Sequence, residues 1–436
     1  MQLRSSLKQL WIESKANPGF TILYVGGVAF TVTFTMVIAM IFYVHVAPVY
    51  PEYNRGTTSY ISSATIQKES DGMMMMSNIG RPFVEEYMEK SKNLEFYTLS
   101  IAYANNTALI QPINGEDFKA NIRYTDPNFF KLYDYEFLEG HPFSQADYDA
   151  GIRSVVVSNK IANRLFGSTS EAIGKEISID FAPNRIVGVM REGSPLCFDS
   201  YAQVAAPLTV LPENPSGGDN YQYLFGNLKA AIKFKDKAQA DAFNDELNEM
   251  LRRTTASDTT GWKLSHNLRS HAAKTLFSSD KSNDMAEAIR PMLLILFVLL
   301  LIPAINISGM IGGQMDRRIA EIGVRRSFGA TRGELTRQVI FENLMLTLVG
   351  GAIGLIGAWL TVIFCRQWIL NLIIDSWEWE DMGVSSNIEL TGEMIFAPTL
   401  FLIMIGICLV LNLLSAYIPI RLSLRRQIVN SINQKR

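Results

Sequence analysis

Four long apolar runs constrain the fold of this chain more than any other feature. They cover residues 20–46, 291–311, 339–364 and 395–418. Each run has about 21 to 27 residues, enough for a helix to cross roughly 30 Å of hydrocarbon. Basic residues precede the first run, but its apolar core is too long for a secretory signal, so we expect an uncleaved anchor. The runs predict four transmembrane helices.

The basic residues predict how these helices are oriented. The loop of residues 314–338 carries six arginines against three acids, and the tail of residues 419–436 carries five basic residues and no acid. The loop of residues 366–394 instead holds six acids and one arginine. Because basic loops stay inside, we expect both termini and the 314–338 loop in the cytoplasm, and the acidic loop outside. Residues 47–286 then lie outside the membrane, and residues 1–19 form an amphipathic helix on its inner surface.

The outer segment has a mixed helix and strand pattern and is long enough for a real core. Strand and helix patterns occur near its start and again near its end, on either side of a central block. We therefore expect a large mixed α+β extracytoplasmic domain of two subdomains, one interrupting the other. The expected helices are residues 82–90 and 237–253, and the expected strands are residues 94–103 and 228–234.

The central block has its own local signals. A buried-type strand over residues 153–157 leads into a helix that begins near Ser158. Two further strands follow, joined by a turn predicted around Pro183 and Asn184. Four consecutive methionines at residues 73–76 are typical of plain packing or a loop, with an adaptable apolar binding surface as the alternative.

The sequence contains no recognisable catalytic or metal-binding motif. His266 and His271 stand five apart in a polar stretch and are interpreted as surface histidines rather than as a metal pair. The dipeptide Gly174-Lys175 lacks the upstream glycine of a phosphate-binding loop. The three cysteines form no disulfide framework. We therefore expect no enzyme activity, no catalytic residue, no metal and no bound cofactor, and the formal net charge of −2 gives no indication of nucleic-acid binding.

Small residues, rather than charges, mark the predicted spans. No Asp, Glu, Lys or Arg lies near the middle of any span, and Glu342 near an inner end comes closest. Glycines four positions apart, such as Gly350 and Gly354, let helix backbones approach closely, either within one chain or across a dimer seam. The glycines expected in this contact are Gly350, Gly351, Gly354 and Gly357.

The charged loop itself carries helix signals. A helix can continue from the second span and stop at Gly329, because glycine is the usual left-handed terminator. Thr331 then caps a new helix, and Glu334 three residues later completes a capping box. We expect a rigid helix–turn–helix elbow in the cytoplasm, with apolar residues exposed between the charges. The arginines also fix topology, but topology alone requires no capped elbow.

The run RRIAEIGVRRSFGATRGELTRQVIFENLMLTLVGGAIGLIG, residues 317–357, closely resembles the signature of FtsX-like permeases of the MacB type. Elements such as VVVSNKIANRLFG, IGKEISID and RIVGVM resemble the MacB periplasmic core. His141 stands where arginine is usual, and Ser327-Phe328 stand where a small residue and leucine are preferred. Together these matches extend over nearly the whole chain.

The resemblance implies an ABC transporter permease of the bacterial inner membrane, with residues 47–286 in the periplasm. Such a permease transmits movement rather than forming a channel. It divides residues 47–286 into a porter-like part, about 50–120 and 223–285, and an inserted part, about 121–222. In this division of the chain, the four transmembrane helices cover residues 20–46, 287–313, 339–365 and 395–418. The element that couples to ATP hydrolysis would consist of Arg317, Arg318, Glu321, Gly323, Arg325, Arg326, Gly329, Ala330, Thr331 and Arg332.

The implied partners are a separate ATP-binding subunit, which carries ATP and Mg, a second permease chain that is identical or related, and the lipid bilayer. A periplasmic adaptor or an outer-membrane component are further candidates. The implied activity is export of antimicrobial compounds, peptides or other periplasmic substrates. The alternatives are release of lipoproteins from the membrane and regulation of cell-wall hydrolases in the manner of FtsX.

Overall fold

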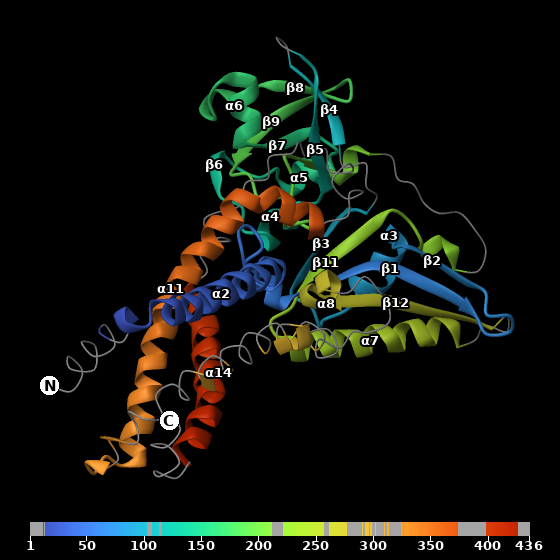
Figure 1. Cartoon of the computed structure of the whole chain (residues 1–436). Helices are drawn as coiled ribbons and strands as arrows, with labels where there is room; N and C mark the ends of the chain where they lie inside the picture. The colour runs from blue at the N-terminus through green and yellow to red at the C-terminus, as the bar shows by residue number, and fades with distance from the viewer. Residues whose placement is uncertain are drawn as a thin grey trace. The chain divides into compact units, whose positions relative to one another are not determined.

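The computed structural model describes residues 12, 14–102, 107–112, 116–211, 221–256, 261–276, 327–373 and 398–425, with residues 290, 293–295, 297, 298, 301, 309, 312, 313, 324 and 325. The chain divides into a helical unit, residues 1–43, 290–369 and 394–436, and a sheet unit, residues 44–289 and 370–393. Figure 1 shows the elements of both units. Most of the predicted amphipathic helix and second span, and the Asn and Gly-rich stretch 212–220, lie outside the described residues.

The described part of the sheet unit is built on one sheet of 12 strands. The strands are β1 (Thr58–Lys68), β2 (Met74–Asn78), β3 (Phe96–Ile101), β4 (Thr107–Gln111), β5 (Phe118–Thr125), β6 (Phe137–Gly140), β7 (Ser154–Ser158), β8 (Glu176–Ile179), β9 (Ala182–Met190), β10 (Val204–Pro207), β11 (Leu228–Lys233) and β12 (Trp262–Ser270).

The order of the strands is β10-β7-β9-β8-β4-β5-β3-β11-β1-β12, with β2 beside β1 and β6 beside β9. Strand β1 pairs antiparallel with both β11 and β12, so segments before and after the central block lie in one sheet. Strand β5 pairs with β3 and, in parallel, with β10. Since β5 therefore belongs to both halves of the sheet, the division into two subdomains stays a prediction.

Short helices and helical turns cover the sheet. They are η1 (Arg55–Thr57), α3 (Arg81–Phe83), η2 (Val84–Met88), α4 (Asn128–Leu132), α5 (Gln145–Asp149), α6 (Asn159–Phe166), η3 (Ser170–Ala172), η4 (Leu208–Val210), η5 (Gln222–Leu224), α7 (Lys237–Thr255) and α8 (His271–Leu276). Helix α7 follows β12 closely in Figure 1 and buries Phe243, Leu247 and Leu251.

Local sequence signals explain where the helices begin and end. Helix α6 begins next to Ser158, as predicted, and the Ser158 hydroxyl caps it by accepting a hydrogen bond from the backbone N–H of Ile161. Gly167, with φ of +80°, ends that helix in the left-handed conformation. The carboxylate of Asp236 caps α7 by accepting from the backbone N–H of Gln239. The predicted helices and strands of the sheet unit are confirmed within a few residues at each end.

One predicted turn is wrong. The hairpin between β8 and β9 turns at Asp180 and Phe181, which both have positive φ, of 47° and 67°. Pro183, expected in the turn, lies in β9 opposite Ser178. Aspartate tolerates the left-handed conformation, and its carboxylate accepts a hydrogen bond from the backbone N–H of Leu109. Proline near the first residue of a strand leaves most of the ladder intact, so the proline was a misleading signal.

The methionine run lies at an edge of the sheet. Met74 begins β2, which pairs with β1. Met73, Met74 and Met76 are exposed, whereas Met75 packs on the sheet core. Of the two expectations for this run, plain packing applies to Met75, whereas a strand replaces the loop over residues 74–76.

The described part of the helical unit contains three long helices, α2 (Pro18–Val46), α11 (Arg332–Ile373) and α14 (Pro398–Arg425). Two helices among the described residues, Pro18–Val46 and Gly333–Cys365, are long and apolar enough to cross a membrane. Helix α11 continues to Ile373, beyond the predicted end of the third span at residue 365. Trp359 of α11 packs on Phe401 of α14 with ring centroids 5.5 Å apart. The number of four spans stays a prediction.

Candidate functional site

The elbow before α11 has the local structure that its sequence predicts. Gly329 adopts φ of +93°, in the left-handed region. The hydroxyl of Thr331 accepts a hydrogen bond from the backbone N–H of Glu334 at 3.2 Å, and Glu334 Oε2 accepts from the Thr331 N–H at 2.9 Å. These reciprocal bonds form a capping box. The chain therefore turns at Gly329 and enters α11 through a defined cap.

A polar chain connects the elbow to the interior of the helical unit. Arg325 donates a hydrogen bond to Gln338 Oε1 at 3.1 Å, and Gln338 Nε2 donates to Glu342 Oε1 at 3.0 Å. Glu342 is buried, with 6% of its surface exposed. Because Arg325 precedes the turn and Gln338 lies in α11, the network ties the two sides of the elbow together.

An apolar surface also lies on the elbow, as the sequence indicates. Phe328 is 89% exposed and Val324 is 51% exposed. Ala330 packs against the core of the helical unit, which includes Leu335. An exposed aromatic side chain beside arginines is a feature typical of surfaces that bind a protein partner.

The structure does not describe every residue of the predicted coupling element. Arg325, Gly329, Ala330 and Thr331 are brought together around the turn, and Arg332 begins α11. Arg317, Arg318, Glu321, Gly323 and Arg326 lie outside the described residues. The coupling role of all ten residues stays a prediction.

Three of the four predicted packing glycines lie against α2 of the same chain. A Cβ added to Gly350 would come within 2.8 Å of Val28 Cβ, and one added to Gly354 within 2.7 Å of Val32 Cβ. A Cβ on Gly357 would come within 2.7 Å of Thr33 Oγ1. Real Cβ atoms do not approach so closely, so these glycines let α11 touch the backbone of α2.

Gly351 differs from its neighbours, because a Cβ there would meet no atom within 4 Å. Helix α2 of the same chain packs on the seam of Gly350, Gly354 and Gly357. This packing within the chain is enough to explain the spacing of these three glycines in the sequence. A dimer contact at Gly351 stays a prediction.

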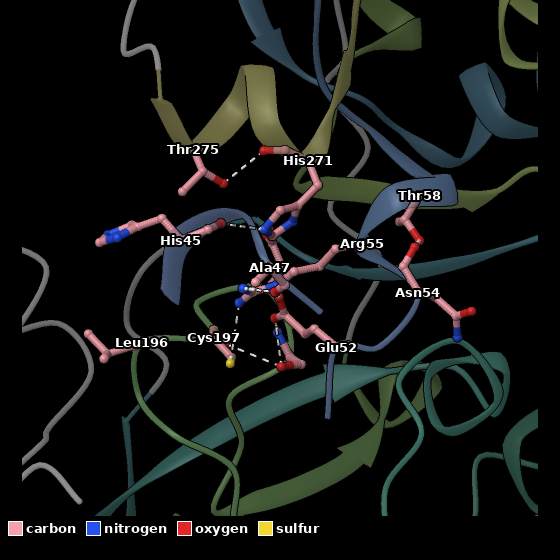
Figure 2. Close-up of polar contacts among 12 residues, drawn as sticks. His45, Ala47, Glu52, Asn54, Arg55, Thr58, Leu196, Cys197, His271 and Thr275 are labelled. Atoms are coloured by element: carbon pink, nitrogen blue, oxygen red, sulfur yellow. Dashed lines mark hydrogen bonds and ion pairs between the residues drawn. The ribbon is translucent and has the colours of Figure 1, made fainter. Parts of the chain in front are cut away.

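A third constellation, absent from the sequence predictions, lies at the C-terminal end of α2 (Figure 2). Arg55 donates hydrogen bonds to the carbonyl oxygens of Val44 and Ala47, at 2.6 and 2.8 Å. Its Nε donates to Glu52 Oε2 at 2.7 Å. Both charged side chains are almost inaccessible to water, at 2% for Arg55 and 1% for Glu52. All four residues belong to the sheet unit.

Glu52 also binds a loop far along the chain, residues 194–201. Its Oε1 accepts from the hydroxyl of Ser200 at 2.7 Å and from the Ser200 backbone N–H at 3.1 Å. Arg55 Nη2 approaches the sulfur of Cys197 at 3.4 Å. Burial raises the pKa of the Cys197 thiol, and the Glu52 charge adds to this effect. The thiol is therefore neutral at physiological pH.

The interpretation of His271 as a surface residue is wrong. It is 4% exposed, and its Nε2 lies 3.0 Å from the carbonyl oxygen of His45 at the end of α2. His266 is half-buried in β12, and burial lowers its pKa to about 4. The residues that surround these histidines in the fold belong to β1 and α2, which are distant in the sequence. The polar residues next to the histidines in the sequence were therefore a misleading signal.

No group of three or more potential metal ligands occurs among the described residues. Three features stand out among the described residues: the elbow, the glycine seam and the junction at the end of α2.

Two family models account for most of the sequence. Residues 21–250 match the MacB-like periplasmic core domain. Residues 293–428 match the FtsX-like permease C-terminal domain. The chain belongs to the MacB-type family of ABC transporter permeases. Permeases of this family reside in the inner membrane with a periplasmic domain, so the sheet unit corresponds to the periplasmic core and the elbow to the FtsX-like region.

Curated relatives match the chain over part of their length. The pyoverdine export ATP-binding/permease protein PvdT of Pseudomonas savastanoi is 24% identical over 261 residues, covering 57% of this chain and 37% of PvdT. The uncharacterized ABC transporter permease YknZ of Bacillus subtilis is 23% identical over 250 residues, covering 55% of this chain and 56% of YknZ. The chain therefore spans about a third to a half of these relatives.

Solved structures of periplasmic and extracellular regions are also similar. The periplasmic region of MacB from Actinobacillus actinomycetemcomitans matches with 15% identity and a TM-score of 0.32, over 47% of this chain and 88% of that one. The extracellular domain of YknZ from Gram-positive bacteria matches with 14% identity and a TM-score of 0.33, over 47% of this chain and 99% of that one.

Proposed function

We propose that this permease transmits the energy of ATP hydrolysis on a separate subunit to its periplasmic sheet unit. ATP binding draws two permease chains together at their elbows, and the long helices carry the movement across the membrane. The chain itself binds no cofactor in this proposal, because ATP and Mg are held by the partner. Both termini lie in the cytoplasm, and four helices span the membrane.

The elbow is the observation that carries the proposal. Phe328 is 89% exposed at a turn whose cap is formed by Thr331 and Glu334. A rigid turn with an exposed aromatic side chain can dock into another protein without losing its shape. The bonds from Arg325 through Gln338 to the buried Glu342 connect this docking point directly to α11. Movement imposed on the elbow therefore reaches a membrane helix.

Export is the activity we propose for the complex. The name of PvdT states pyoverdine export for that protein, and a related task here is export of an antimicrobial compound, a peptide or another periplasmic substrate. Lipoprotein release and control of cell-wall hydrolases remain the alternatives.

Co-purification tests the proposal. The tagged full-length chain is extracted from membranes of the producing cells in mild detergent, and bound proteins are identified by mass spectrometry. We expect an ABC ATP-binding subunit in stoichiometric amount and ATP hydrolysis by the complex. Arg325→Glu places a carboxylate near Gln338 and Glu342 and should abolish stimulation of hydrolysis by the permease. Recovery without any ATP-binding subunit would refute the proposal.

A further inference from the structure

The C-terminal end of α2 lacks the usual glycine cap and is held by a side chain instead. The last carbonyls of an α-helix have no partner inside the helix and need donors from elsewhere. Arg55 supplies donors to two carbonyls at this end, those of Val44 and Ala47. Its positive charge also suits the negative end of the helix dipole. A planar guanidinium holds several acceptors in fixed directions, which a flexible ammonium group does not.

Glu52 turns this helix-end contact into a link with the sheet. One carboxylate oxygen binds Arg55, and the other binds the hydroxyl and the backbone N–H of Ser200. Ser200 lies in the loop of residues 194–201, which runs from β9 to β10. The end of α2 is therefore connected to the central block of the sheet unit through two buried side chains (Figure 2).

The same loop also contacts helix α8 and strand β11. Asp199 pairs with Lys274 of α8 and lies 3.6 Å from Lys229 of β11. Burial alone would raise the pKa of Asp199, but the two lysines hold it well below its usual range. Helix α8 is the last described element before residue 290, which belongs to the helical unit. Its first residue, His271, contacts the carbonyl of His45.

We infer that Arg55 is the positioning residue that locks the end of α2 to the loop of residues 194–201, so that movement of α2 is passed to the sheet unit. Glu52 is its partner, and the pair of Asp199 and Lys274 joins the same loop to α8. The end of α2 and helix α8 are thereby attached to one short loop. The inference rests on the proposed function and assigns the transmission step to named residues.

Stability alone is a poor explanation of this junction. Burying two charges costs desolvation free energy, and apolar side chains of similar volume often stabilise a fold equally well. Hydrogen bonds from a guanidinium are directional, and so they resist rotation of α2 relative to the sheet. A joint that transmits movement needs this directional stiffness.

Energy transfer to the bilayer tests the inference in the intact complex. The complex of permease and ATP-binding subunit is reconstituted in nanodiscs that contain an acceptor-labelled lipid. Lys175, exposed before β8, is replaced by cysteine and carries the donor dye, after Cys365→Ser and Cys408→Ser remove the other reactive candidates. Transfer is recorded in ADP and in ATP with vanadate, alongside the rate of ATP hydrolysis.

We expect a nucleotide-dependent change of transfer in the unmodified junction and at least a fivefold smaller change in Arg55→Gln. The rate of hydrolysis should remain within twofold of the unmodified complex. An unchanged response in Arg55→Gln would overturn the inference. If the unmodified complex itself showed no change, the proposed function would fail instead, so the two failures are distinguishable.

Arg252→Gln is the matched control. Arg252 pairs with Glu249 at the same i,i+3 spacing as Arg55 and Glu52, but both members of this pair are exposed. Its response to nucleotide should equal that of the unmodified complex, and an equal loss there would overturn a specific role for Arg55. If Arg55→Gln fails to fold, Arg55→Lys is the second variant, because lysine keeps the positive charge but lacks the planar guanidinium group. This variant should at least halve the nucleotide-dependent change of transfer. A full response would overturn the inference.

Hydrogen exchange of residues 44–58 provides a measurement that needs no variant. A stiff joint predicts that these amides stay equally protected with ADP and with ATP and vanadate. A nucleotide-dependent loss of protection there would mean that the joint opens, and would overturn the inference.

Discussion

Thr33 donates a hydrogen bond from its hydroxyl to the main-chain carbonyl of Gly354, at 2.9 Å. A side chain can reach the backbone of a neighbouring helix only where that helix carries no Cβ in the way. Gly350 and Gly357 continue the contact one turn to either side. Such close approach replaces hydrophobic burial, which offers no advantage between helices in lipid, by van der Waals packing and interhelical hydrogen bonds.

Gly354→Ala should separate α2 from α11. The new Cβ would come within 2.6 Å of the Ala29 carbonyl oxygen, so the helices must shift. Overpacking of this kind costs about 1–3 kcal/mol, measured as a fall in the free energy of unfolding of the chain in detergent. Gly351→Ala is the matched control, because nothing lies within 4 Å of its new Cβ. Equal stability of both variants would contradict the seam.

Phe328→Ala should weaken binding of the ATP-binding subunit. An exposed aromatic anchor at the centre of an interface contributes about 2 kcal/mol, or roughly 30-fold in affinity. Titration of the purified subunit onto the permease in nanodiscs measures the loss. Phe364→Ala serves as the control, because Phe364 is 80% exposed within the apolar part of α11. An unchanged affinity of Phe328→Ala would place the contact elsewhere.

Thr331→Ala should loosen the first turn of α11. The variant leaves the backbone N–H of Glu334 without its acceptor, which costs about 1 kcal/mol of helix stability. Hydrogen exchange at that amide should speed up by roughly fivefold. Glu334→Gln retains an acceptor for the Thr331 N–H and should change the rate much less. Slow exchange in Thr331→Ala would mean that the capping box is not formed in the membrane protein.

His266 should make the sheet unit less stable in mild acid. Burial lowers its folded pKa to about 4, whereas an unfolded histidine titrates near ~6.5. Between these values the unfolded chain binds more protons, so stability is full above pH ~6.5 and falls as the pH drops towards ~4. The slope approaches about 1.4 kcal/mol per pH unit.

Hydrogen exchange of β12 at several pH values, corrected for the intrinsic rate, measures this slope. His266→Gln should remove the histidine's share, so the variant should lose less stability between pH ~6.5 and ~5. Burial raises the pKa of Asp126 to about 6, so this residue makes the fold more stable as the pH falls. Its contribution is the same in the unmodified protein and in His266→Gln, and it cancels when the two slopes are compared. Identical slopes would show that His266 is not buried in its neutral form.

The elbow could be predicted from sequence because capping is local. Gly329, Thr331 and Glu334 lie within six positions, and their preferences alone select the turn and the cap. The glycine spacing likewise indicated close helix packing. It could not identify α2 as the partner, because Thr33 and Gly354 are 321 positions apart.

The junction could not be predicted, because each of its contacts spans the chain. Glu52 and Ser200 are 148 positions apart, and His271 and the His45 carbonyl are 226 apart. Arg55 stands in a polar stretch, where an exposed arginine is the usual outcome. Its burial follows from the end of a helix and a distant loop meeting at the same place, which depends on the sheet topology and on no local pattern.

The most direct test of the central claim compares the permease in nanodiscs with and without its ATP-binding subunit. The recorded quantity is energy transfer from a dye at residue 175 to the bilayer. The account predicts that ATP with vanadate changes the transfer only when the subunit is present. A response of the permease alone, or no response of the complex that hydrolyses ATP, would contradict the account.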